Sequence, residues 1–200
     1  MGRDYFVSYP NDLFEKTPPD FKWNEYCNQA NEPVHHTAYL FTYAGKPWLA
    51  QRWARLVMNH AYGPGLAGLC GNEDVGLVCF ERGGHSSIHP VSPVDGIYII
   101  GSPLFDEVTF QLDPHFESGE TFAILARNNS AENRYVQSAT LDGKPFNRAW
   151  LRHSEVAGGG VLELVMGPKP NESWGSAPDE LPPQNFPAHQ AGSRLEASRR

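Results

Sequence analysis

The chain has 200 residues, of which 40% are hydrophobic and 20% charged, so it is long enough to bury one sizeable core or one domain plus part of another. Its formal net charge of −7 and scattered Lys and Arg argue against a nucleic acid or an anionic membrane as partner. It contains no apolar run of membrane-spanning length and no signal-peptide pattern at its start, so we expect neither a membrane association nor an export signal within this chain.

Two helices are predicted in the first third of the sequence. The first begins at Glu32-Pro33 with Asn31 as its N-cap, presents His36, Leu40 and Tyr43 at helical spacing, and ends before Gly45. The second runs from Pro47 to about Tyr62, where a Gly-Pro-Gly sequence stops it. Joined by a short turn, the two helices would form an antiparallel hairpin.

From about Ile97 the apolar residues alternate as they do in strands. Strands are predicted at 98–100, 108–112, 122–125, 135–141 and 161–165. Asp142-Gly143 supplies hairpin turn chemistry between two of these segments. Helices first and strands afterwards indicate an α+β chain with an antiparallel β part. The Pro-rich, polar residues 176–200 are expected to be a disordered tail.

The densest group of acidic and amide side chains is Asn72-Glu73-Asp74, on a loop with glycines at both ends. Two carboxylates and an amide on such a loop can face a sugar and a water molecule together. A solvated acidic turn is the alternative that composition alone favours.

A second polar group lies at the start of the first predicted helix and contains Asn31, Glu32, His35 and His36. Adjacent residues point about 100° apart on a helix, so the two histidines are not a natural chelating pair. A capped helix start with surface histidines is the alternative to a functional site here.

Several blocks together carry a family resemblance. They are Asn28-Gln29-Ala30-Asn31-Glu32-Pro33-Val34-His35-His36, Tyr43-Ala44-Gly45-Lys46-Pro47-Trp48, Gly68-Leu69-Cys70-Gly71-Asn72-Glu73-Asp74-Val75-Gly76, Ile100-Gly101-Ser102-Pro103-Leu104-Phe105, Ala126-Arg127-Asn128-Asn129-Ser130, Gln137-Ser138-Ala139-Thr140-Leu141-Asp142-Gly143 and Met166-Gly167-Pro168-Lys169-Pro170-Asn171. In this order, over about residues 10–175, the chain resembles the C-terminal part of glycoside hydrolase family 92, the calcium-dependent exo-acting α-mannosidases.

The resemblance implies a fold and a division into domains. Family members have an N-terminal β-sandwich and an (α/α)6 barrel, with the active site between them. We therefore expect residues 1–91 to be the C-terminal, incomplete part of the catalytic barrel, residues 92–175 to be a β-rich C-terminal region, and 176–200 to be the tail. Helices cut from a barrel would expose apolar surface, through which this chain could associate.

The resemblance also implies a mechanism and its residues. Family enzymes invert configuration, with a general acid and a general base on opposite sides of the sugar ring. Asp74 matches the base, while Asn72 and Glu73 match positions that orient water or substrate. Asn31, Glu32 and His36 are placed in the sugar or calcium environment, with Glu32 as the candidate metal ligand because calcium binds oxygen ligands.

The function implied is hydrolysis of nonreducing-end α-linked mannose, α-1,2 by expectation, in mannans or N-glycans. The general acid of the family lies upstream of the matching region, so we expect this fragment to be inactive alone, and its parent enzyme to be exported. The alternative is a non-catalytic carbohydrate-binding or structural β module.

One stretch departs from the family pattern. After Gly76 family members usually continue with a helix reading Gln-Met-Ser-Ala-Trp-Tyr-Val, whereas this chain reads Leu77-Val78-Cys79-Phe80. Codons compatible with Leu77 to His85 give Trp-Tyr-Val-Leu-Ser-Ala-Ala-Gly-Ile when the frame is shifted by one base. We therefore predict a frame error at about residues 77–88.

Overall fold

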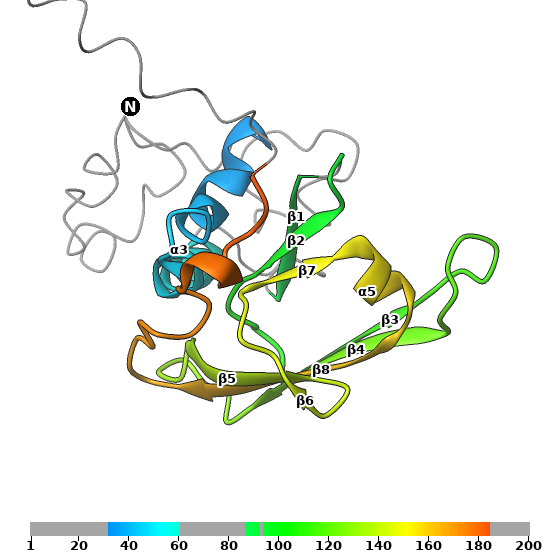
Figure 1. Ribbon diagram of the computed structural model, residues 1–200. Helices are drawn as coiled ribbons and strands as arrows, with labels where there is room; N and C mark the ends of the chain where they lie inside the picture. Colours follow the sequence, from blue (N-terminus) through cyan, green and yellow to red (C-terminus); the bar gives the residue numbers. More distant parts are fainter. Residues whose placement is uncertain (1–31, 61–86, 93, 185–200) are drawn as a thin grey trace, which may run out of the picture.

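The computed structural model describes residues 32–60, 87–92 and 94–184, which form two β-sheets and a layer of helices (Figure 1). The helical elements are η1 (Glu32–Phe41), α3 (Pro47–His60), α5 (His153–Ala157) and η2 (Pro178–Glu180). The strands are β1 (Ile88–Ser92), β2 (Ile97–Ile100), β3 (Glu107–Gln111), β4 (Thr121–Arg127), β5 (Tyr135–Leu141), β6 (Lys144–Pro145), β7 (Trp150–Arg152) and β8 (Gly160–Gly167).

The strands pair in two sheets. The small sheet has the order β1-β2-β7, and both of its pairings are antiparallel. The large sheet has the order β3-β4-β8-β5-β6, in which β4 and β8 run parallel and the other pairs antiparallel. The all-antiparallel prediction is therefore wrong for one pair, because β8 returns from the small sheet through α5 and enters beside β4 in the same direction.

The core lies between the two sheets. Alternation along β4 buries Phe122 and Ile124 on one face, as a strand with one buried face requires. They pack with Leu162 and Leu164 of β8 and with Leu151 of β7 in one apolar cluster. The predicted strands are confirmed by this arrangement, and that at 135–141 coincides with β5.

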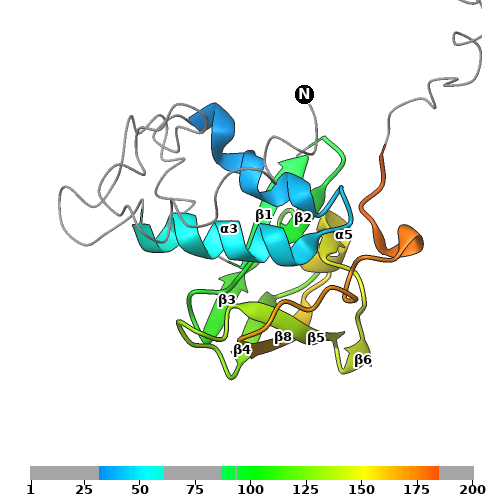
Figure 2. The ribbon, with the colours of Figure 1, turned by 90° about the vertical axis from the view of Figure 1, so that its left-hand side faces the viewer.

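The helices cover the other face of the small sheet (Figure 2). Ile97 and Ile99 of β2 point away from the core between the sheets and pack with Tyr39 of η1 and Ala54 of α3. Alternate side chains of β2 thus belong to two different apolar cores, one on each side of the small sheet. The helical hairpin is consequently attached to the β part by apolar packing.

The first predicted helix differs from the structure in type and in buried face. Glu32–Phe41 is a 3-10 helix, and i+3 hydrogen bonds continue from Thr42 to Gly45. The buried residues of this helix and of the turn after it include His35, Tyr39 and Thr42, whereas Leu40 is 41% exposed. The predicted stripe is wrong for His36 and Leu40, which are exposed, because Tyr39 faces β2 instead. Its third member, Tyr43, is partly buried and packs against the same cluster.

The second helix and the hairpin turn are largely as predicted. The structure confirms α3 from Pro47 as far as His60, and the predicted stop beyond it lies outside the described residues. Asp142 and Gly143 have φ values of 50° and 74°, the left-handed pair that a tight hairpin turn needs. The turn leads from β5 into the two-residue β6, a strand that the sequence did not predict.

The start of the predicted tail is ordered. The chain continues past Trp174 into η2, where the indole N–H of Trp150 donates a 2.8 Å hydrogen bond to the carbonyl of Glu180. The prediction of disorder from Ser176 is therefore wrong as far as residue 184, because this buried indole needs an acceptor and the tail supplies it. Residues 185–200 lie outside the described part.

Within the described segments, no helix has the length and apolar content that a membrane span requires.

Candidate functional site

Most of the predicted site residues lie outside the described residues. These are Asn31, Asn72, Glu73 and Asp74, and also residues 77–86 of the predicted frame error. Glu32 is the first residue of η1. The described chain on either side of the segment that carries Asn72, Glu73 and Asp74 ends at His60 of α3 and resumes at Ser87, directly before β1.

The two adjacent histidines of η1 have different environments. His36 is exposed, whereas His35 is buried at 4% exposure. One turn further on, the ring of Tyr39 stacks on the imidazole of His89 in β1, with centroids 4.2 Å apart and planes only 2° from parallel. The two imidazoles therefore lie in different surroundings, and a ring stack joins η1 to the small sheet.

The polar face of α3 is anchored in the β part through Arg55, which is 4% exposed. Its Nε donates to Oγ of Ser102 at 3.1 Å, and its Nη2 donates to Oδ1 of Asn129 at 2.7 Å and to the carbonyl of Pro103. Its Nη1 donates to the carbonyl of Ser130 at 3.3 Å. The guanidinium therefore joins α3 to two separate loops of the β part.

These partners of Arg55 are neutral oxygens. Burial lowers the pKa of the Arg55 guanidinium to about 10, with a smaller contribution from the like charge of Arg134. The group still carries its charge at neutral pH. A buried cation is stable here because several of its N–H donors find an oxygen acceptor.

Gln51, one helical turn before Arg55, makes a second polar anchor. Its Oε1 accepts a 3.0 Å hydrogen bond from the backbone N–H of Val136, the second residue of β5. Gln51 is 1% exposed, so this bond satisfies a strand N–H where water does not reach. Together Gln51 and Arg55 fix the helix that leads toward the segment carrying Asp74.

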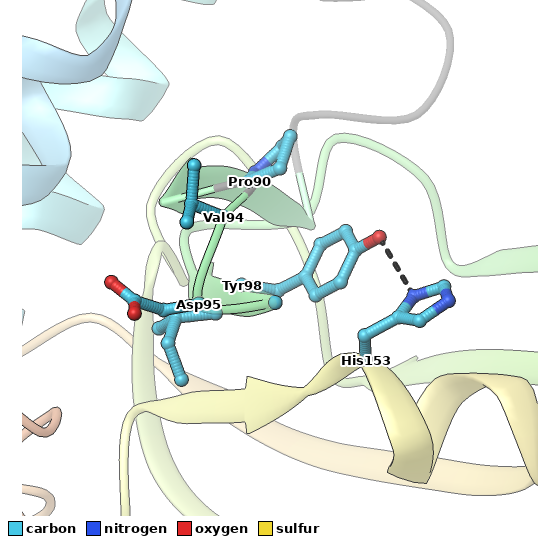
Figure 3. Close-up of a pocket in the computed structure, with 7 residues that line it drawn as sticks. Pro90, Val94, Asp95, Tyr98 and His153 are labelled. Carbon is cyan, nitrogen blue, oxygen red and sulfur yellow. Dashed lines mark hydrogen bonds between the residues drawn. The ribbon is translucent and has the colours of Figure 1, made fainter.

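A cavity of about 440 Å³ lies beside the turn that joins β1 to β2 (Figure 3). It is lined by Pro90, by residues 94–98 and by His153, the first residue of α5. Oη of Tyr98 is 3.2 Å from Nδ1 of His153, and Nε2 of His153 is 3.4 Å from Oε1 of Glu117. Tyr98, His153 and Glu117 therefore form a polar chain, which we call the Tyr98 chain.

Glu117 sets the protonation pattern of the Tyr98 chain. A carboxylate facing Nε2 favours the proton on that nitrogen, which leaves Nδ1 to accept the phenol O–H of Tyr98. Burial, followed by the charge of Glu117, raises the pKa of the Tyr98 phenol. Tyr98 therefore keeps its proton at neutral pH and is a hydrogen-bonding group, not an anionic nucleophile.

A second hollow of similar volume is lined by β6, the connection from β6 to β7, and residues of α5 and η2. Arg148 dominates it, with its guanidinium over the rings of Phe146 and Trp150 at 4.7 and 4.3 Å and in an ion pair with Glu155. The guanidinium of Arg148 thus already interacts with two aromatic rings and a carboxylate. This arrangement fits a role in stabilising the β6–β7 connection.

The structure shows no metal site in its described part. No group of three or more His, Cys, Asp or Glu side chains gathers there in a way that could hold an ion. Of the predicted calcium environment, His36 alone has a described side chain, and it is exposed.

Sequence reasoning missed Arg55, Gln51 and the Tyr98 chain. A signal for the first two exists, since Gln51 and Arg55 are four residues apart on the helix and are flanked there by the apolar residues Ala50, Ala54 and Leu56. Tyr98 and His153 are 55 residues apart, and their contact follows from the pairing of β2 with β7. No local sequence pattern could have indicated it.

Comparison with known proteins relates this chain to one family. The family model of the "Glycosyl hydrolase family 92 catalytic domain" matches residues 1–168. An "Uncharacterized secreted glycosidase" of Arthroderma benhamiae is 33% identical over 156 residues, which are 76% of this chain and 20% of that protein.

Solved structures of family GH92 mannosidases are also similar to this chain. A family GH92 α-mannosidase of Bacteroides thetaiotaomicron in complex with mannoimidazole matches with a TM-score of 0.72 and 32% identity, over 78% of this chain and 20% of its own. A family GH92 inverting mannosidase of the same species, strain VPI-5482, matches with a TM-score of 0.69 and 38% identity, over 77% of this chain and 20% of its own.

The chain thus spans about a fifth of the length of these relatives. The family model covers more than half of the chain, including every predicted site residue from Asn31 to Asp74. This chain belongs to glycoside hydrolase family 92.

Proposed function

We propose that this chain is the C-terminal part of an inverting exo-α-mannosidase that removes nonreducing-end mannose, with α-1,2 linkages as its substrate. The observation that carries the proposal is the match of the family 92 catalytic-domain model to residues 1–168. The 38% identity to an inverting mannosidase and the likeness to a mannosidase that binds mannoimidazole support the same substrate class.

In this proposal Asp74 is the general base. It deprotonates a water molecule that attacks the anomeric carbon from the face opposite the leaving oxygen, while an acid from another part of the enzyme protonates that oxygen. Asn72 lacks an ionisable proton, so it orients the water or a sugar hydroxyl, and Glu73 binds the substrate. Asn31, Glu32 and His36 contact the sugar or its metal environment.

Calcium is part of the proposal, with Glu32 as a ligand. A hard cation that accepts carboxylate, amide and sugar hydroxyl oxygens would fix the orientation of the terminal mannose. Family membership and the amide- and carboxylate-rich Asn31-Glu32 pair support this assignment.

We propose that η1 and α3 belong to the C-terminal, incomplete part of an (α/α)6 barrel, and that the 200 residues alone do not turn over substrate. The chain spans about a fifth of the length of its relatives, and in this proposal the general acid comes from another part of the enzyme. Without that acid the leaving oxygen has no proton donor, which costs on the order of 10²- to 10⁴-fold in rate. The secreted relative supports export of the intact enzyme.

The test is mannose release from α-1,2-mannobiose by the 200-residue chain and by the product of the complete locus. We expect activity in the complete product, inhibition by a calcium chelator, and β-mannose as the first anomer seen by NMR. Asp74→Asn should reduce kcat by at least about 10²-fold, whereas Glu73→Gln should act mainly on KM. If Asp74→Asn left the kcat of the complete product unchanged, the assignment of Asp74 as the base would be overturned.

Sequencing the genomic bases around Gly76 tests the proposed frame error. A sequence that encodes Gln-Met-Ser-Ala-Trp-Tyr-Val in an alternate frame supports a longer working enzyme. Bases incompatible with that frame would refute it.

A second candidate function is a non-catalytic carbohydrate-binding or structural module. It is favoured by the self-contained core between the two sheets, whose buried members all come from residues 88–174. Binding of mannose-terminated glycans without turnover by the complete product would support it over the enzyme.

A further inference from the structure

The cavity beside the β1–β2 turn is built by a fixed backbone. Gly96 has a φ of +60°, and a Cβ placed on it would meet the Cβ of His153 at 3.0 Å. The backbone N–H of His153 donates a 2.7 Å hydrogen bond to the carbonyl of Gly96. Gly96 and the start of α5 therefore hold each other in position, as the wall of a pre-formed site requires.

The cavity offers apolar and polar surface together. Pro90, Val94 and Tyr98 supply C–H and aromatic faces, and Val94 is 98% exposed at the opening. Figure 3 shows the phenol oxygen of Tyr98 directed at His153, with Asp95 at the opposite end of the lining. A ligand can thus lie against a ring and meet polar groups at its edges.

The polar groups select what can bind. With Nε2–H of His153 facing Glu117, the phenol O–H of Tyr98 donates a hydrogen bond to Nδ1, and its oxygen retains lone pairs that accept hydrogen bonds from a ligand. The carboxylates of Asp95 in the lining and Glu117 behind His153 give the surroundings a negative charge. An anion is therefore disfavoured, and a neutral ligand rich in hydroxyl donors is favoured.

The volume of the cavity limits the size of the ligand. About 440 Å³ lies in the lower part of the range of small-ligand pockets, roughly 300–1,000 Å³. A sugar ring combines a C–H face, which stacks on an aromatic ring, with hydroxyl groups at its edge.

We propose that this cavity is a second carbohydrate-binding site, which takes one hexopyranose ring with its C–H face on Tyr98 and a hydroxyl group donating to Tyr98 Oη. The site shares no residue with the predicted catalytic set. It would hold a glycan chain independently of the hydrolysed end, which goes beyond the proposed hydrolysis.

The experiment is an NMR titration of the isotope-labelled 200-residue chain with methyl α-D-mannopyranoside and, separately, methyl α-D-glucopyranoside. The amides of Gly96 and Ile97 and the imidazole C–H signals of His153 should shift together, with a dissociation constant on the order of 1 mM. Tyr98→Ala should weaken binding by at least about 10-fold, because it removes the stacking ring.

Tyr98→Phe keeps the ring and removes the hydrogen-bonding oxygen, so it should weaken binding about threefold to tenfold while leaving a dispersed spectrum. His115→Ala is a control variant away from the site, since the His115 side chain is 85% exposed and does not line the cavity. It should leave the titration unchanged. Asp74→Asn should also leave it unchanged, which separates this site from the proposed catalytic one.

Three results would overturn the proposal. One is the absence of shifts at Gly96, Ile97 and His153 up to about 100 mM sugar. Another is sugar binding that neither Tyr98 variant weakens. The third is a stronger response of the same signals to ethylammonium than to either sugar, which would make the cavity a cation site.

Discussion

Arg55 and Ser102 join the helical and β parts of the chain by a buried hydrogen bond of 3.1 Å between Nε and Oγ. Ser102 in turn contacts a second loop, because its hydroxyl donates a 2.7 Å hydrogen bond to the carbonyl of Arg134. A single side chain of α3 is thus connected to the loops before β3 and before β5. The orientation of the helix relative to the sheets depends on this contact.

Replacing Arg55 with Met should destabilise the chain by roughly 3 kcal/mol, because it leaves several buried oxygens without a donor. Arg55→Lys keeps the charge but cannot reach the same set of acceptors, so it should recover only part of the loss. Urea unfolding followed by circular dichroism measures both.

The matched control is Arg127→Met, which removes an exposed ion pair with Glu163. It should cost about 0–1 kcal/mol. If Arg55→Met were as mild as Arg127→Met, the helix would not depend on the guanidinium.

Trp150→Phe should release the segment that follows residue 176. The substitution keeps an aromatic ring but removes the N–H that donates to the carbonyl of Glu180. We expect faster amide hydrogen exchange in η2 and the residues after it, corresponding to a loss of about 1 kcal/mol.

Trp174→Phe provides the comparison. Its indole donates at 3.0 Å to the carbonyl of Phe146, within the core between the sheets. It should lower the global stability and leave η2 no more exposed than the rest of the chain. Equal exchange of η2 in both variants would show that the tail is not held by Trp150.

The strands were predictable because the burial of one face leaves apolar, strand-favouring residues along each segment. In β4 the buried Phe122 and Ile124 alternate with half-buried residues, whereas in β5 a bulge between Val136 and Ser138 interrupts the alternation. α3 was predictable for the same reason, with a helical period and Pro47 at its start.

What the sequence did not predict depends on contacts between distant segments. Pro90 weakens the strand signal of β1, which is tolerated because β1 lies at the edge of the small sheet. The parallel pairing of β4 with β8 joins residues about forty positions apart, and local periodicity carries no information on it.

The site residues from Asn31 to Asp74 were predicted from family motifs. Neither a motif nor the periodicity of the sequence predicts the Tyr98 chain. Motifs indicate residues whose roles are shared with relatives. The contact of Tyr98 with His153 instead arises from strand register, with Tyr98 opposite Leu151 in the β2–β7 pair.

Gly143→Ala should destabilise the β5–β6 hairpin by about 1 kcal/mol. Gly143 has a φ of +74°, and an added Cβ would meet nothing within 4 Å, so the cost is conformational and not steric. Gly143→Asn should cost less, because asparagine adopts the left-handed region more readily. Thermal unfolding of the three proteins tests this order, and equal midpoints would contradict it.

The turn at Asp113 should titrate abnormally. The backbone N–H of His115 donates to Oδ1 of Asp113, and the imidazole Nδ1 lies 2.9 Å from the same oxygen. These contacts, the backbone one first, hold the pKa of Asp113 below its ordinary value of 3.8. Since the folded pKa is depressed, the stabilisation is present above the unfolded pKa and is lost as the pH falls through the folded one.

His115→Ala removes the imidazole and keeps the backbone N–H, so the pKa of Asp113 should rise without reaching its ordinary value. Carboxyl carbon NMR during an acid titration measures it in both proteins. Glu132, whose pKa is lowered chiefly by its own backbone N–H and then by Ser130, is the internal reference and should titrate alike in both. A full return of Asp113 to its ordinary pKa in the variant would mean that the imidazole, and not the backbone of the turn, stabilises the carboxylate.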